Sequence, residues 1–160
     1  MSEDSLDLKV LGEYLRPLVP DIGDLQDAEK FSDGQSNPTY LLTTSAGQYV
    51  LRRQPPGELL KSEHAVDREF RVIKALQGSD VPVARAIHLC EDRNIIGSLF
   101  YLMSYVPGRI FWDPTLPGLD PAQRTAIYME MNRVLAALHD IDIEAVGLND
   151  FGRPGSYFER

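Results

Sequence analysis

A chain of 160 residues, 43% hydrophobic and 25% charged, has the composition of a globular protein long enough to bury a core. Its formal net charge of −8 argues against a general binder of nucleic acid or anionic membranes, because nothing offsets phosphate repulsion over the whole surface. The single cysteine, Cys90, fits a reducing cytoplasm, and no apolar run reaches transmembrane length.

Near the N-terminus, leucines recur with helical spacing and predict an amphipathic helix over residues 4–18, capped by Asp4 or Ser5. Residues 31–53 then predict a strand, a glycine-containing loop, a strand, a tight turn and a further strand. The loop 33–38 combines Gly34 with small polar residues, and such a tip can present backbone N–H groups to an anion.

A loop of this kind beside a cation on the next strand is typical of the nucleotide-binding lobe of kinases. Only one of the three glycines of the kinase loop G-x-G-x-x-G is present, so an ordinary turn is the alternative.

A second helix is predicted from about residue 62 or 63 to 77, and Glu69 falls on its apolar stripe. A carboxylate there is costly unless it is paired. Glu69 therefore either reaches solvent at the edge of the stripe or points inward to meet a cation. Arg52 is the obvious partner, since it shares a strand face with Val50. The alternative for Arg52 and Arg53 is a solvated edge strand.

Two more strands are predicted over residues 86–91 and 99–105, with a turn between them. We interpret His88 as a strand residue and Cys90 as a small buried one. The last strand is broken at once by Pro107-Gly108, so backbone groups beyond the sheet edge are free to pair with a purine. A final helix is predicted from Pro121 to about residue 139, with Asp120 as its cap.

Together these segments resemble the aminoglycoside phosphotransferase-like family, in the branch fused to or found beside acyl-CoA dehydrogenases. The resemblance lies in the order and spacing, over about residues 24–160, of F-S-D-G-Q-S-N-P-T-Y, Y-V-L-R-R-Q-P-P-G, D-R-E-F-R-V-I-K-A-L, F-Y-L-M-S-Y-V-P-G-R-I-F and L-A-A-L-H-D-I-D. It implies an α+β fold. Residues 1–106 would form a protein-kinase-like N-lobe, with a five-stranded antiparallel sheet, one packed helix and an N-terminal helix. Residues 107–160 would form the linker and the start of a helical C-lobe.

The resemblance also implies a set of nucleotide-binding positions: Gly34, Gln35, Ser36, Asn37, Val50, Arg52, Glu69, Met103, Ser104 and Val106. The first four lie in the loop that positions the nucleotide, with Ser36 and Asn37 as polar contacts. Arg52 stands where kinases use a lysine to grip phosphate, and Glu69 braces it. The last three would surround adenine. Met103 would lie at the back of the adenine pocket, and Ser104 and Val106 would contact the base through main-chain groups.

The family's catalytic segment, H-G-D-x-x-x-x-N, and its later metal-binding aspartate do not occur in this sequence. We therefore expect no catalytic residue and no metal ligand in this chain, and no turnover by it alone. The simplest interpretation is that the sequence is the front part of a longer kinase, whose ATP and Mg²⁺ chemistry depends on metal ligands in the missing C-lobe.

The leading interpretation is thus the nucleotide-binding lobe of a cytoplasmic, ATP-dependent small-molecule kinase. Its phosphate acceptor would be a hydroxyl group, with a hydroxyacyl-CoA suggested by the acyl-CoA dehydrogenase linkage. Self-association through the exposed helix after residue 120 is also expected. One alternative is a non-catalytic nucleotide-binding or protein-interaction module with the same fold. Another is an unrelated α+β domain, which predicts that no pair forms between Arg52 and Glu69.

Overall fold

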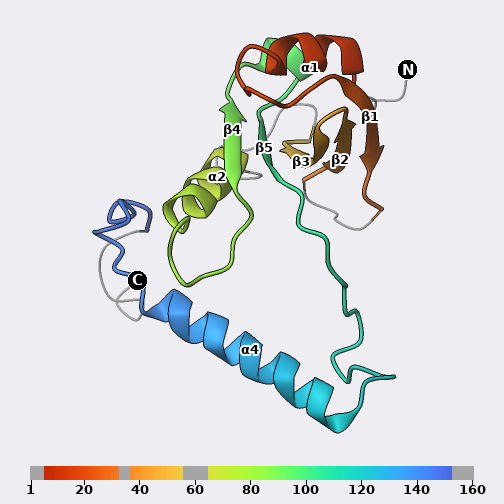
Figure 1. Ribbon diagram of the computed structural model, residues 1–160. Helices are drawn as coiled ribbons and strands as arrows, with labels where there is room; N and C mark the ends of the chain where they lie inside the picture. The colour runs from red at the N-terminus through yellow and green to blue at the C-terminus, as the bar shows by residue number, and fades with distance from the viewer. Residues whose placement is uncertain (1–5, 33–36, 56–64, 153–160) are drawn as a thin grey trace. The chain divides into compact units, whose positions relative to one another are not determined.

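The computed structural model describes residues 6–32, 37–55 and 65–152, which form two units (Figure 1). One unit comprises Met1–Lys74 and Ala84–Val106, and the other comprises Ala75–Val83 and Pro107–Arg160. The first unit contains the sheet and every described residue of the expected nucleotide site.

The sheet has five antiparallel strands in the order β1-β2-β3-β5-β4. In sequence they are β1 Leu25–Lys30, β2 Thr39–Thr44, β3 Gly47–Arg53, β4 Ala86–Cys90 and β5 Phe100–Ser104. Residues 45 and 46 form the tight turn between β2 and β3, where Thr44 Oγ1 accepts the N–H groups of Ala46 and Gly47, each at 3.2 Å. The predicted five-stranded antiparallel sheet is confirmed.

The first strand lies earlier in the chain than the stretch 31–53 in which it was expected. β1 ends at Lys30, which pairs with Tyr40 of β2. It is an edge strand, and only Leu25 and Ala28 are partly buried in it. An edge strand that leaves most side chains in water has little apolar alternation, so its sequence gives a weak strand signal.

One face of the sheet packs against α1, Leu8–Leu15, and the four-residue helix α3, Arg93–Ile96. Leu11 and Leu15 of α1 are buried in this core. The helix is shorter than predicted, because it begins after Asp7, whose Oδ1 accepts the N–H groups of residues 9 and 10 at 3.0 and 3.1 Å. The expected caps, Asp4 and Ser5, lie outside the described residues.

The opposite face packs against α2, Val66–Ala75. Val66 and Phe70 pack against Tyr101 of β5, and the centroids of the Phe70 and Tyr101 rings are 5.8 Å apart. The predicted start of this helix falls outside the described residues. α2 therefore covers this side of the sheet (Figure 1), and Ala86 and Leu89 of β4 pack against the same cluster.

In the second unit the main element is α4, Pro121–His139, with the predicted bounds. Asp120 caps it, accepting the Gln123 N–H at 2.8 Å, and the Gln123 side chain accepts the Asp120 N–H at 3.1 Å. None of the residues of α4 is buried. Among the helices of the described segments, none has the length and apolar character that a membrane crossing requires.

Candidate functional site

Strand register brings polar residues of three strands into one row on the α2 face of the sheet. Thr39 of β2 lies opposite Arg52 of β3, and Arg52 lies opposite Tyr101 of β5. Directly opposed residues of an antiparallel sheet place their side chains on the same face, within contact distance. The next row toward the β2–β3 turn contains Val50 opposite Met103, on the same face because side chains alternate along a strand.

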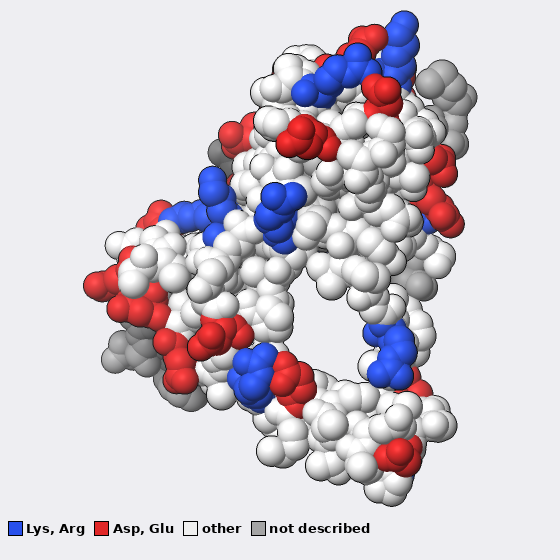
Figure 2. Space-filling model, viewed as in Figure 1, with Lys and Arg blue, Asp and Glu red and all other residues white. Residues whose placement is uncertain are grey.

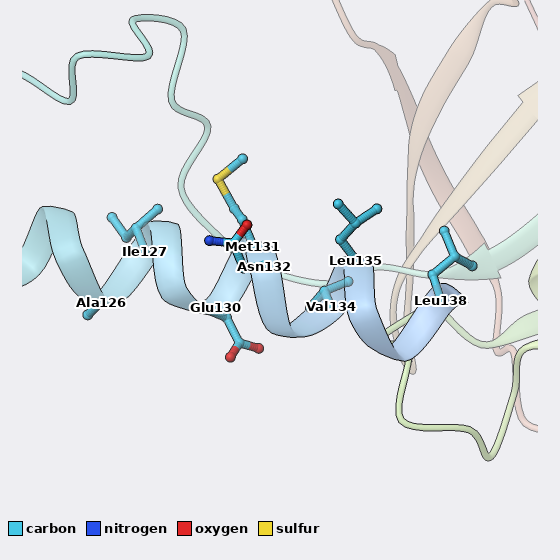
Figure 3. Close-up of a pocket in the computed structure, with 8 residues that line it drawn as sticks. All are labelled: Ala126, Ile127, Glu130, Met131, Asn132, Val134, Leu135 and Leu138. Atoms are coloured by element: carbon cyan, nitrogen blue, oxygen red, sulfur yellow. The ribbon is translucent and has the colours of Figure 1, made fainter. Parts of the chain in front are cut away.

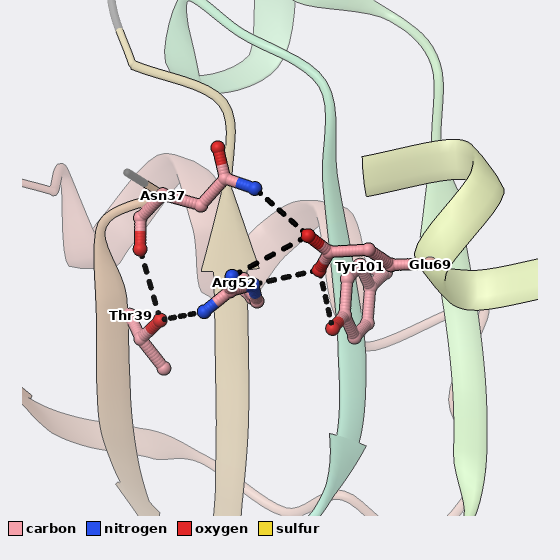
Figure 4. Close-up of polar contacts among 5 residues, drawn as sticks. All are labelled: Asn37, Thr39, Arg52, Glu69 and Tyr101. Atoms are coloured by element: carbon pink, nitrogen blue, oxygen red, sulfur yellow. Dashed lines mark hydrogen bonds and ion pairs between the residues drawn. The ribbon is translucent and has the colours of Figure 1, made fainter. Parts of the chain in front are cut away.

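Glu69 of α2 meets this row and pairs with Arg52 (Figure 4). Arg52 Nε donates to Glu69 Oε2 at 2.7 Å, and Nη2 donates to Oε1 at 3.3 Å. The two side chains are 30% and 36% exposed, so the pair lies at the border of core and solvent. Glu69 thus points inward to the sheet, and the interpretation as an unrelated domain, which predicted no such pair, is wrong.

Three further residues complete a hydrogen-bonded network around the pair (Figure 4). Asn37 Nδ2 donates to Glu69 Oε1 at 3.0 Å, and the Tyr101 hydroxyl donates to Glu69 Oε2 at 3.1 Å. Arg52 Nη1 donates to Thr39 Oγ1 at 3.2 Å, and that hydroxyl donates to the Asn37 carbonyl at 3.1 Å. Burial raises the pKa of Tyr101, and the adjacent Glu69 carboxylate raises it further, so the phenol stays a donor.

Thr39 and Tyr101 are the members of this network that sequence reasoning missed. Tyr101 is two residues before Met103 on the same strand, and this spacing puts both side chains on one face. This spacing alone places Tyr101 on the sheet face that carries Met103. The pairing of Tyr101 with Arg52 becomes visible only with the register of β3 and β5.

The remaining predicted nucleotide contacts fall in three places. Gly34, Gln35 and Ser36 lie outside the described residues. Ser104 closes the end of β5, where its N–H donates to the Arg85 carbonyl and its hydroxyl accepts the Arg85 N–H, both at 2.9 Å. Val106 follows the strand and is 64% exposed. Their role as nucleotide contacts stays a prediction.

Arg53 points to the opposite face and is buried. The residue is 3% exposed, and Nε donates to Ser98 Oγ at 2.9 Å. β3 lies between β2 and β5 in the middle of the sheet. The alternative that placed Arg52 and Arg53 on a solvated edge strand is therefore wrong.

The described residues offer no evident metal site, since they contain no group of three or more His, Cys, Asp or Glu side chains that could hold one ion. Acidic and basic side chains are interspersed over the face in Figure 2, without a broad basic patch among the residues described there.

A surface hollow in the second unit is lined only by side chains of α4. Ile127, Met131, Leu135 and Leu138 point to the same side of the helix (Figure 3). None of its lining residues belongs to the unit that contains Arg52. We interpret it as the apolar face of α4 and not as a ligand site.

Two curated proteins are similar in sequence to this chain, and both are named as acyl-CoA dehydrogenase family members. The chain is 52% identical to mouse acyl-CoA dehydrogenase family member 10 over 131 residues, covering 82% of this chain and 12% of that protein. It is 40% identical to human acyl-CoA dehydrogenase family member 11 over 164 residues, covering 100% of this chain and 21% of that protein. The chain therefore spans about a fifth or less of the length of these curated relatives.

A crystal structure of a Ralstonia eutropha protein assigned to the aminoglycoside phosphotransferases matches with a TM-score of 0.83 and 48% identity. The match covers 97% of this chain and 44% of that one. It confirms the predicted kinase-like α+β fold. The model of the phosphotransferase enzyme family matches residues 27–160, from within β1 through α4 and beyond, and with this match the chain belongs to that family.

Proposed function

We propose that this chain supplies the nucleotide-binding part of an ATP-dependent phosphotransferase that acts on the hydroxyl group of a small molecule. The observation that carries the proposal is the Arg52–Glu69 pair, on the sheet face that also carries Val50 and Met103. A braced cation beside apolar side chains suits a nucleotide, which combines a charged phosphate chain with a flat apolar base.

The geometry of Arg52 fits a phosphate. A guanidinium has five N–H donors, of which three are used: one by Thr39 and two by Glu69. One hydrogen on each Nη then has no partner among the described residues. Arginine is well suited to phosphate because its planar fork can offer two donors at once.

The expected Mg²⁺ finds no fitting ligand set in the described residues. The 160-residue sequence contains no histidine followed two positions later by aspartate, so the proposal assigns this polypeptide nucleotide binding and not turnover. The names of the mouse and human relatives support an acyl-CoA-linked hydroxyl compound as the phosphate acceptor.

The test is calorimetric titration of the polypeptide with ATP. We expect Arg52→Ala to weaken ATP binding by about tenfold or more, since charge-assisted hydrogen bonds to phosphate are lost. The control is Arg16→Ala, which makes the same charge change at the exposed Arg16–Asp24 pair. Absence of ATP binding by the wild type, or equal losses in both variants, would overturn the proposal.

A further inference from the structure

We propose that Asn37 and Tyr101 are positioning residues that fix the Glu69 carboxylate and thereby hold Arg52 ready for phosphate. The inference rests on the proposed function, and it gives two side chains a task that the family resemblance does not assign to them. Tyr101 was absent from the predicted site, and Asn37 was predicted to contact the nucleotide itself.

The Glu69 carboxylate receives four hydrogen bonds, two on each oxygen. Oε1 accepts from Asn37 and Arg52 at 3.0 and 3.3 Å, and Oε2 accepts from Arg52 and Tyr101 at 2.7 and 3.1 Å. An ionised carboxylate has about four acceptor positions, so this one is saturated. Rotating it about its terminal bond would break contacts on both oxygens, which fixes its plane.

The four donor groups come from three separate segments. Asn37 precedes β2, Arg52 lies in β3 and Tyr101 lies in β5. Asn37 is 3% exposed, and the Tyr101 ring is held by Phe70 of α2 at 5.8 Å between centroids. Glu69 is thus braced by buried side chains on both sides of Arg52, although its own side chain is 36% exposed.

This bracing is needed because a single ion pair at such exposure is held weakly. With Arg52 alone as partner, the carboxylate could turn and take the guanidinium with it. Asn37 and Tyr101 remove that freedom, so the Nη hydrogens keep one direction. The Thr39 hydroxyl adds to this, since it accepts from Arg52 and donates to the Asn37 carbonyl. Asn37 is thereby tied to the ion pair through its side chain and its carbonyl.

If Asn37 and Tyr101 act in this way, their loss should affect binding of the phosphate chain and not binding of adenine. Loss of either bracing donor should weaken binding of the phosphate chain and leave adenine binding unchanged, since adenine is expected to contact the sheet near Val50 and Met103. A general packing defect would weaken both.

The experiment compares ATP with adenosine, which lacks the phosphates. We expect Tyr101→Phe and Asn37→Ala to weaken ATP binding about three- to tenfold, and adenosine binding by less than about twofold, as suits loss of one hydrogen bond to a charged group. The matched control is Tyr14→Phe, which removes a hydroxyl that hydrogen-bonds His88 at 3.0 Å in the α1 layer. It should bind both ligands as the wild type does.

A second readout needs no nucleotide. The Nε–H signal of Arg52 in an NMR spectrum should shift and exchange faster with water in both variants, and stay unchanged in Tyr14→Phe. If the wild type fails to bind ATP, the proposed function fails, and the Nε–H signal alone then decides whether these residues brace the pair. An unchanged signal, or equal weakening of ATP and adenosine binding, would overturn the inference.

Discussion

Gly23 has a backbone conformation in which a side chain would be unfavourable for two reasons. Its φ is +74°, and a Cβ there would lie 2.4 Å from Ser45 Oγ and 2.9 Å from the Ala46 nitrogen. Ser45 is held in place, since its Oγ accepts the Asp24 N–H at 2.9 Å and its own N–H donates to the Asp24 carbonyl at 3.0 Å. A methyl group at residue 23 therefore collides with the anchored tip of the β2–β3 hairpin.

We expect Gly23→Ala to lower the free energy of unfolding by about 2–4 kcal/mol, from backbone strain together with the clash. Gly78→Ala is the control, because Gly78 has a φ of +84° but a Cβ there would meet no atom within 4 Å beyond its own chain neighbours. It should cost about 1 kcal/mol from strain alone. Urea unfolding of the two variants measures the difference, and equal losses would show that the clash with Ser45 is relieved.

At this same scale, sequence reasoning identified residues whose chemistry conflicts with their position. Glu69 stands on an apolar stripe, and the cost of an unpaired charge there left two alternatives, solvent at the edge of the stripe or a cationic partner; the structure shows the partner, Arg52. Tyr101 causes no such conflict, because a tyrosine in a strand is unremarkable by itself. Its hydrogen bond to Glu69 depends on cross-strand register and on the approach of α2, which local sequence does not specify.

At the level of elements, Tyr14 of α1 makes a polar contact with β4 within a largely apolar layer. The Tyr14 hydroxyl and His88 Nε2 share a hydrogen bond of 3.0 Å. Burial lowers the pKa of His88. Burial also raises the pKa of Tyr14, with smaller contributions from Cys90 and Asp92, so the phenol stays neutral beside it. Burial therefore favours an uncharged imidazole, because the charged form would lose hydration.

The lowered pKa of His88 predicts a loss of stability in mild acid. Above about pH 6.5, the ordinary pKa of histidine, His88 is neutral in both the folded and the unfolded chain. As the pH falls below that value the unfolded chain takes up the proton first, so the free energy of unfolding declines until the folded state is protonated too. Carboxylates titrate mostly nearer to pH 4, which separates the two effects.

We expect His88→Gln to show a smaller loss of unfolding free energy between about pH 7 and pH 5 than the wild type. Urea denaturation at several pH values measures it. The control is His139→Gln, which changes an exposed residue of α4 and should keep the wild-type slope. If His88→Gln has the wild-type slope, the half-buried imidazole of His88 is not the source of the pH dependence.

Elements differ in how far local sequence determines them. α4 has the predicted bounds because its start is marked by Asp120 and Pro121, a cap and a first-turn residue that act locally. α3 was expected as a turn, since it has only four residues and its ends at Asp92 and Gly97 resemble turn signals. The position of β1 was predicted wrongly because most of its side chains are exposed, so it lacks apolar alternation and its pairing with β2 is what defines it.

For the molecule as a whole, the apolar face of α4 predicts self-association of the 160-residue polypeptide. Met131, Leu135 and Leu138 are 58%, 51% and 44% exposed and lie on one side of the helix. An exposed apolar stripe of this kind favours contact between copies, because contact removes it from water. The net charge of −8 opposes association, so we expect the effect to grow as salt screens that repulsion.

Sedimentation equilibrium over a range of protein and salt concentrations measures this association. The double variant Met131→Gln, Leu135→Gln should shift the protein toward monomer, because it places two amides in the middle of the stripe. Met129→Gln is the matched control, since Met129 is 65% exposed but does not line the hollow along α4. It should associate as the wild type does. The prediction fails if the wild-type polypeptide is monomeric at every protein and salt concentration. Charge repulsion would then outweigh the apolar contact of α4 even when salt screens it.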